Sequence, residues 1–214
     1  MARKHINFAI TTTCNRACPE CCFRIPYRRP QHFSAAYAQE MAAALTGFHT
    51  VLLTGGEPTC HPELEYIVEH AREWFQCTEL RVETNAFKPQ RLVSLADYFN
   101  GIYVTHYQPP EFPLSNTKEI DFLRARLPAG KLFVSLAKHL LNQSMGGTLP
   151  CHRFDGGDSV SCFNGQLYPC CVAWGIDASR GVPVQVGWEQ ALQRVEPTCD
   201  NCLYALVGLA TTKD

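Results

Sequence analysis

Short runs of aliphatic and β-branched residues alternate with segments of helical periodicity along the first two thirds of the chain. The runs are a few residues long and are bounded by turn-forming residues, which predicts β-strands. They lie at residues 6–11, 50–54, 80–84, 102–106 and 131–136. Strands that are separated by helices are typical of β/α units around a parallel sheet, and this order therefore predicts an α/β fold.

Apolar residues at helical spacing predict a helix in each gap between these strands. Serine and asparagine are suited to the cap of a helix, and proline is suited to its first turn. The expected helices begin near Ser34, Pro62, Pro89 and Asn116. Asn116 and Glu119 together resemble a capping box, in which both side chains satisfy backbone N–H groups of the first turn. From about residue 142 the pattern breaks into Gly, Pro, Asn and Cys, which predicts a second, smaller module.

The length of 214 residues and the formal net charge of −1 limit the classes of protein to be considered. The length suits one domain with a small appended module, and we expect the division at residues 1–141 and 142–214. The charge balance lacks the basic excess of a general nucleic-acid binder. The first residues include no apolar segment of a signal peptide, and the apolar stretch 203–210 is shorter than the roughly 20 residues that span a bilayer. We therefore expect a soluble, cytoplasmic protein with no membrane segment.

Twelve cysteines are a large number for a chain of this length. Without an export signal, such thiols favour metal binding or catalysis over a disulfide framework. Cys14, Cys18 and Cys21 follow the first strand at C-x3-C-x2-C spacing. Three thiolates on one loop can bind three irons of a 4Fe–4S cluster, and the fourth iron then stays open to a ligand. For Cys22, Cys60, Cys77 and Cys162 we expect ordinary buried thiols.

Two further motifs end the second and third strands. Gly55-Gly56-Glu57-Pro58 follows an apolar run, and Glu83-Thr84-Asn85 closes the next one. Parallel α/β folds bind their ligands at the carboxyl ends of the strands, and this rule brings both motifs and the cysteine loop to one edge.

Taken together, the three motifs resemble those of the radical S-adenosylmethionine (radical SAM) superfamily. The resemblance implies a partial, open (β/α) barrel of five to six parallel strands and a cluster on Cys14, Cys18 and Cys21 whose open iron binds SAM. It also implies that the backbone of 55–58 and the Glu57 side chain receive the methionyl amine, and that Phe23 lies beside the adenine. The residues expected to bind the cofactor are Phe23, Gly55, Gly56, Glu57, Pro58, Thr84, Asn85 and Thr105.

Glu83 and His106 are the candidates for a catalytic role, because both come from the carboxyl ends of expected strands. The alternative for His106 is packing or a structural hydrogen bond, and the alternative for Glu83 is a salt bridge at the mouth of the barrel.

A second set of cysteines lies in the C-terminal module. Cys151 is followed at C-x13-G-x4-C spacing by Cys170, and Cys199 and Cys202 form a C-x2-C pair. This pattern resembles the Twitch/SPASM auxiliary-cluster modules and the architecture of scyllo-inosamine dehydrogenase type enzymes. The resemblance implies a second 4Fe–4S cluster on these four residues, with Cys171 as the alternative to Cys170. The same ligand set also suits a structural zinc ion, and spacing does not separate the two metals.

The resemblance implies reductive cleavage of SAM to a 5′-deoxyadenosyl radical that abstracts hydrogen from a substrate. A flavodoxin or ferredoxin would supply the electron, and the substrate would be a small molecule or a peptide. A fully ligated auxiliary cluster favours a two-electron oxidation, whereas three cysteine ligands would let that cluster hold the substrate. The alternatives are a redox-neutral rearrangement or modification of a nucleotide or nucleobase, activation of a glycyl-radical partner protein, and a non-catalytic zinc-binding interaction module.

Overall fold

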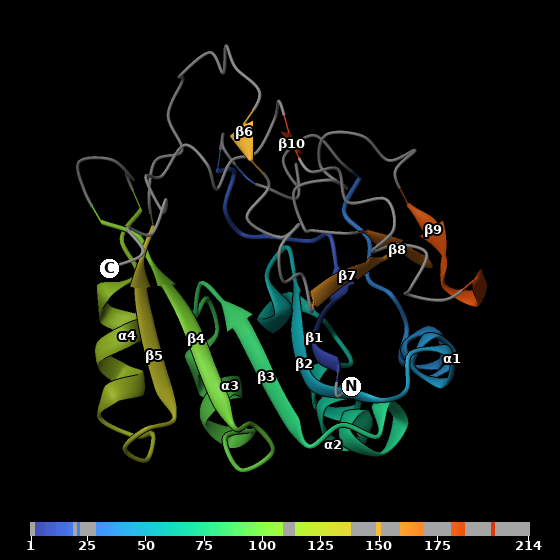
Figure 1. The fold of residues 1–214 in the computed structure, drawn as a ribbon. Coiled ribbons are helices and arrows are strands. Elements are labelled where there is room, and N and C mark those ends of the chain that lie inside the picture. Colours follow the sequence, from blue (N-terminus) through green and yellow to red (C-terminus); the bar gives the residue numbers. More distant parts are fainter. Residues whose placement is uncertain are drawn as a thin grey trace, which may run out of the picture.

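A mainly parallel sheet with helices on one face runs through the described part of the chain (Figure 1). The computed structural model describes residues 3–18, 21, 29–108, 114–137, 149–150, 159–168, 181–186 and 198–199. The strand order is β5-β4-β3-β2-β1-β7-β8-β9, so each strand from β1 to β5 lies beside its successor. A separate pair is formed by β6 (Leu149–Pro150) and β10 (Thr198–Cys199).

The five strands predicted from the sequence are all present and parallel. They are β1 (Arg3–Thr11), β2 (Phe48–Gly55), β3 (Glu79–Thr84), β4 (Gly101–His106) and β5 (Leu132–Leu136). Because neighbouring strands are joined through helices, their carboxyl ends meet at one edge of the sheet. Three of these ends carry the motifs noted above.

A hairpin from the C-terminal third of the chain continues the same sheet. β7 (Ser159–Phe163) pairs in parallel with β1, and β8 (Gln166–Tyr168) returns antiparallel beside it. The short β9 (Val182–Pro183) completes that edge. Residues that the sequence assigns to the second module are thus hydrogen-bonded to β1, which gives the sheet a sixth parallel strand.

The helices begin close to the predicted positions. They are α1 (Ala35–Ala44), α2 (Leu64–Phe75), α3 (Pro89–Ser94) and α4 (Thr117–Arg124), and short 3-10 turns lie at η2 (Pro58–Cys60) and η4 (Val184–Val186). Ser34 caps α1 as expected, since its hydroxyl accepts a hydrogen bond from the backbone N–H of Tyr37 at 3.2 Å. The capping-box prediction at Asn116 is wrong: Asn116 precedes α4, but its side chain makes no cap hydrogen bond.

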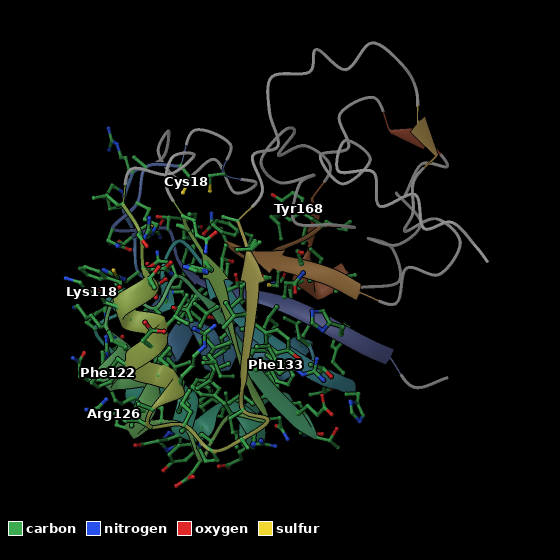
Figure 2. All side chains as sticks on the ribbon, turned by 90° about the vertical axis from the view of Figure 1, so that its left-hand side faces the viewer. Cys18, Lys118, Phe122, Arg126, Phe133 and Tyr168 are labelled. Atoms are coloured by element: carbon green, nitrogen blue, oxygen red, sulfur yellow. The ribbon has the colours of Figure 1, made fainter. Side chains whose placement is uncertain are left out.

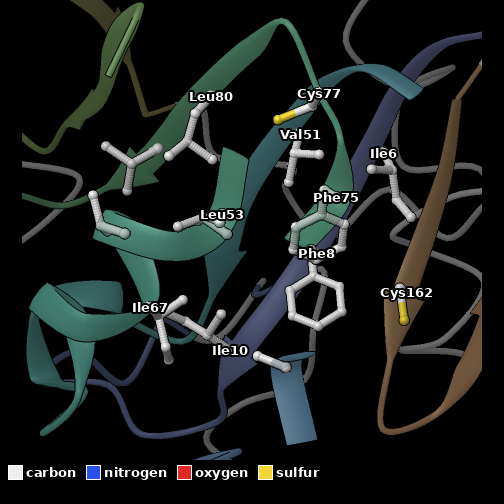
Figure 3. Close-up of a cluster of buried hydrophobic side chains, with 14 of the residues drawn as sticks. Ile6, Phe8, Ile10, Val51, Leu53, Ile67, Phe75, Cys77, Leu80 and Cys162 are labelled. Atoms are coloured by element: carbon white, nitrogen blue, oxygen red, sulfur yellow. The ribbon is translucent and has the colours of Figure 1, made fainter. Parts of the chain in front are cut away.

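Alternation along the strands divides the sheet into two faces. One face carries Ile6, Phe8, Val51, Leu80 and similar residues, which pack against the helices in the main hydrophobic core (Figure 3). We call the opposite face the inner face; it is defined by Asn7, Thr50, Leu52, Arg81, Glu83, Tyr103, Thr105, Phe133 and Ser135. Contacts across strands agree with this assignment, because the rings of Tyr103 and Phe133 stack with centroids 4.8 Å apart.

The side-chain view shows Cys18 beyond the carboxyl ends of the strands and Phe133 on β5 (Figure 2). Cys77 and Cys162 are buried, as expected, whereas Cys60 is partly exposed. Among the described helices, none combines the length and the apolar character that a transmembrane span requires.

Candidate functional site

The cysteine loop leaves the end of β1 and is fixed by local hydrogen bonds. The backbone N–H of Thr13 donates to the Thr11 hydroxyl at 2.9 Å, and the Thr12 hydroxyl donates to the Arg29 carbonyl at 2.8 Å. Further along, the backbone N–H of Cys21 donates to the Cys18 carbonyl at 3.2 Å. Threonine hydroxyls that bond to nearby backbone groups hold such a loop in one conformation.

Gly55 and Gly56 let the end of β2 pack directly on this loop. The Gly56 N–H donates to the Thr11 carbonyl and the Glu57 N–H to the Thr13 carbonyl, both at 2.8 Å. A Cβ atom on Gly55 would lie 2.2 Å from the Thr11 oxygen, and one on Gly56 would lie 2.3 Å from the Thr13 oxygen. These contacts involve backbone atoms, so no side-chain rotation could relieve them. The glycines are therefore needed to seat the cysteine loop against β2.

The Glu57 side chain turns inward and joins the ends of β2 and β3. It is fully buried, and its Oε1 accepts hydrogen bonds from Thr59 N at 3.0 Å, Thr59 Oγ1 at 2.6 Å and Thr84 Oγ1 at 2.6 Å. Its Oε2 accepts one from the backbone N–H of Asn85 at 2.7 Å. Four donors occupy the carboxylate, and this geometry does not support the expectation that the Glu57 side chain itself receives a ligand amine.

Both threonine hydroxyls that contact Glu57 are fixed in direction. Thr59 Oγ1 accepts the Lys88 N–H at 3.2 Å, and Thr84 Oγ1 accepts the Ala86 N–H at 2.9 Å. Each hydroxyl proton therefore points to Glu57. Burial raises the pKa of the Glu57 carboxyl above its ordinary value, while the hydrogen bonds from Thr59, Thr84 and Asn85 act in the opposite direction. All its partners donate, and they therefore suit the ionised form.

Asn85 connects the end of β3 to the cysteine loop. Its side-chain Nδ2 donates to Asn15 Oδ1 at 2.8 Å and lies 3.8 Å from the Cys14 sulfur. The residue is 6% exposed, and its Oδ1 is buried with no hydrogen-bond partner in the described part of the chain. A buried acceptor is normally satisfied, so this atom is free, among the described residues, to accept a hydrogen bond from a ligand.

The thiols of the loop are close enough to influence one another. Burial raises the pKa of the Cys14 thiol to about 12, and the charges of Glu57, Cys18 and Cys21 act in the same direction. A cysteine binds metal as the thiolate, and a bound metal overcomes such a shift by displacing the proton. Within the residues that the structure describes, no three His, Cys, Asp or Glu side chains converge on a single-ion site.

These residues fit the cluster and SAM that the sequence implies. Cys14, Cys18 and Cys21 would supply three thiolates from one loop. Asn85 Oδ1 would accept a hydrogen bond from an amine or hydroxyl of SAM, which carries both. Pro58 is buried in η2 behind Glu57, where it fixes the turn.

The end of β4 differs from the expectation for His106. His106 is 9% exposed, and its ring nitrogens bond to Thr117 Oγ1 at 2.9 Å and to Gln108 Nε2 at 3.3 Å. Both ring nitrogens are thus occupied by protein groups, and the packing alternative describes this residue better than catalysis. Thr105 lies on the inner face beside Ser135 of β5.

Asn116 is a site residue that the sequence pattern did not reveal. It is 2% exposed; its Oδ1 accepts the Tyr107 N–H at 2.9 Å, and its Nδ2 donates to the carbonyls of Asn85 at 2.7 Å and Thr105 at 2.9 Å. The side chain therefore joins the ends of β3 and β4. In the sequence, an asparagine that precedes a helix and joins two strand ends looks the same as an asparagine that caps the helix.

Glu83 stands on the inner face, opposite Tyr103 of β4. Its carboxylate is reached by solvent but lies among many protein atoms, and this partial desolvation raises its pKa. Arg81, two residues earlier, is paired with Glu79 at 2.5 Å instead. The salt-bridge alternative for Glu83 therefore finds no partner among the described residues.

Several predicted residues lie outside the described part of the chain. They are Phe23, Cys22, Cys151, Cys170, Cys171 and Cys202. Of the C-terminal set, only the backbone of Cys199 is described, in β10 opposite Leu149. The auxiliary site stays a prediction.

Residues 8–109 match the radical SAM superfamily. Over 111 residues the chain is 29% identical to 7-carboxy-7-deazaguanine synthase of Haemophilus influenzae. The aligned segment covers 50% of this chain and 49% of that enzyme. The match thus spans about half the length of the relative.

Two solved structures share the fold. BtrN in complex with AdoMet and 2-DOIA aligns with a TM-score of 0.59 at 12% identity, covering 90% of this chain and 82% of that one. Streptococcus suis SuiB bound to the precursor peptide SuiA aligns with a TM-score of 0.50 at 14% identity, covering 98% of this chain and 67% of that one. The residues that match the radical SAM superfamily, 8–109, carry the cysteine loop, the Gly55–Glu57 turn and Asn85.

Proposed function

We propose that this chain is an enzyme that binds a 4Fe–4S cluster through Cys14, Cys18 and Cys21 and cleaves SAM reductively. The observation that carries the proposal is the junction between the cysteine loop and the strand ends. Gly56 seats the loop, and Asn85 contacts both Cys14 and Asn15 while keeping a buried acceptor that has no partner among the described residues. When bound, the cluster and SAM together supply a 5′-deoxyadenosyl radical for hydrogen abstraction.

Some residues of the chain would hold the cluster, and others would orient SAM. The three thiolates hold the cluster and leave one iron for the amine and carboxylate of SAM. Asn85 Oδ1 and the backbone of residues 55–58 accept hydrogen bonds from SAM, while Glu57 fixes that backbone from behind. Phe23 remains our candidate for contact with the adenine.

The inner face of the sheet would hold the substrate next to this edge. Glu83 is one residue before Thr84 and two before Asn85, so it lies just below the proposed SAM site. A carboxylate that is unpaired among the described residues can bind an amine or a polar hydrogen of the substrate there, and Thr105 adds a hydroxyl on the neighbouring strand. These groups suit a small molecule or a peptide segment.

We propose a two-electron oxidation as the outcome. The substrate would lose one hydrogen atom to the radical, then one electron to an auxiliary 4Fe–4S cluster and one proton to solvent or a base. Cys151, Cys170, Cys199 and Cys202 are the ligands we propose for that cluster. A flavodoxin or ferredoxin would reduce the first cluster.

A redox-neutral modification of a nucleobase is the second candidate. The observation that favours it is the 29% identity to a 7-carboxy-7-deazaguanine synthase, whose name gives a purine-like base as the product. The two candidates differ in electron balance, since the oxidation makes a product two hydrogens lighter and the rearrangement conserves the redox state.

The test is anaerobic reconstitution followed by incubation with SAM and dithionite. We expect iron and sulfide on the chain, and methionine and 5′-deoxyadenosine as products. Cys18→Ala should abolish both products, whereas Cys77→Ala, at a thiol buried beneath the helices, should retain them. About eight irons per chain would support two clusters, and about four with one zinc would favour the redox-neutral candidate. A chain that binds zinc but no iron would refute the proposal and favour a zinc-binding interaction module.

A further inference from the structure

Charged side chains alternate along the inner face of β3, at Glu79, Arg81 and Glu83. Arg81 lies between the two carboxylates but bonds to the first of them, with Nη2 2.5 Å from Glu79 Oε2. The Thr50 hydroxyl donates to the same oxygen at 3.2 Å, and the guanidinium is thus held toward the amino-terminal end of the strand. Glu83 has no hydrogen bond or ion pair among the described residues, so its negative charge stays uncompensated there.

An aromatic surface lies beside this carboxylate. In the register of the sheet, Glu83 is opposite Tyr103 of β4, and Tyr103 is opposite Phe133 of β5. Neighbouring strands are about 4.8 Å apart, so the three side chains form one row across the inner face. The two rings stack with an interplanar angle of 13°, and Phe133 is 44% exposed. The row therefore joins a carboxylate to an apolar surface that solvent reaches.

The next row toward the carboxyl ends of the strands carries no charge. Thr105 and Ser135 are opposite each other there, and Asn85 follows Glu83 by two residues. A strand rises about 3.3 Å per residue, so this row lies about 6.6 Å from the first. A group bound at Glu83 and a carbon presented to the proposed SAM site would therefore belong to one small molecule or to one side chain of a peptide.

We propose that the substrate carries a protonated amine, which binds to Glu83 while the body of the substrate packs on Phe133 and Tyr103. The inference rests on the proposed function, which assigns formation of the radical to this edge of the sheet. An ammonium group compensates the charge of Glu83 and donates charge-assisted hydrogen bonds to it. A carboxylate or phosphate at the same position would meet a like charge, and a neutral group would leave Glu83 without a counter-ion. The inner face thus selects its substrate by charge.

The probes for the test are benzylamine, benzyl alcohol and benzoate, which share a ring and differ in charge at neutral pH. Saturation-transfer difference NMR measures their dissociation constants with the reconstituted full-length protein in the presence of SAM. We expect benzylamine to bind about fivefold more tightly than benzyl alcohol, the upper end for an ion pair that solvent reaches, and benzoate to bind most weakly. Glu83→Gln should remove this preference. The matched control is Glu69→Gln, which removes an exposed carboxylate from α2 in the helical layer and should retain it.

A charge reversal gives a second measurement, because Glu83→Lys should make benzoate the preferred probe. If the wild type binds benzylamine no more tightly than benzyl alcohol, or if either Glu83 variant keeps the preference for benzylamine, the inference is overturned. Formation of 5′-deoxyadenosine by the same wild-type preparation would then leave the proposed function intact. A wild-type chain that takes up no iron would overturn both.

Discussion

Glu57→Gln tests whether one buried carboxylate holds the strand ends in place. Glutamine has the same shape but offers one oxygen instead of two. Its oxygen would stay where three donors from Thr59 and Thr84 converge, and its NH2 would then face the backbone N–H of Asn85. One hydrogen bond to a charged acceptor is lost, and a buried N–H is left unsatisfied. Each effect is worth about 1–3 kcal/mol, and we expect the free energy of unfolding to fall by about 2–4 kcal/mol.

Thermal unfolding under anaerobic conditions, followed by circular dichroism, measures this change. For a chain of this length, 1 kcal/mol corresponds to about 2–4 °C in Tm, so a decrease of roughly 4–16 °C is expected. Glu83→Gln is the control, because that carboxylate is exposed and unpaired among the described residues; its effect should stay within about 0.5 kcal/mol. Amide hydrogen exchange at Asn85 adds a local readout and should accelerate only in Glu57→Gln. If the two variants are equally stable, the role assigned to Glu57 is refuted.

Two further predictions concern the loop and its surroundings. In Gly56→Ala the new Cβ would lie 2.3 Å from the Thr13 oxygen, so the loop must move and most of the reconstituted iron should be lost. The control is Gly101→Ala, whose added Cβ meets only aromatic side chains at 3.0 Å and which should keep its iron. A full iron content in both variants would contradict the packing argument. His61 is fully buried with both ring nitrogens bonded to backbone groups, including Phe33 O at 2.8 Å, and burial lowers its pKa below the ordinary 6.5. The unfolded chain then binds the proton more readily, so stability is full above pH 6.5 and falls as the pH drops below it; urea titrations from pH 7 to 5 should show this slope, and an equal slope in His61→Gln would contradict it.

The positions of the strands and helix starts follow from local rules, which is why the sequence predicts them well. A run such as Val51–Thr54 has the period of a strand, and Ser34 caps the next residues without help from distant parts of the chain. Asn116 obeys no local rule. Its three hydrogen bonds reach Asn85, Thr105 and Tyr107, between 9 and 31 residues away, and only the fold brings these groups together.

The motif residues also make contacts with distant parts of the chain that local sequence rules do not predict. Motif spacing predicts that residues 55–58 meet a ligand, but it does not predict that Gly55 and Gly56 also pack on the cysteine loop or that the Glu57 carboxylate faces the protein. Ala86 illustrates how tightly the next strand end is constrained. It adopts a φ of 62°, a backbone conformation that favours glycine, and its N–H holds the Thr84 hydroxyl in the direction of Glu57. A turn that tolerates this strain must be fixed by its surroundings.

These contacts explain why three motifs far apart in the sequence act as one unit. The cysteine loop rests on Gly56, the carboxylate of the next residue binds the end of β3, and Asn85 at that end contacts Cys14. These contacts form a closed ring from the cysteine loop through Gly56, Glu57 and Asn85 back to the loop, so a shift of any one of them displaces the others. A cluster that binds the loop would therefore also affect the position of Asn85, whose Oδ1 has no partner among the described residues. Binding of the metal and of the second ligand should accordingly be coupled, and iron-loaded protein should bind SAM more tightly than protein without iron.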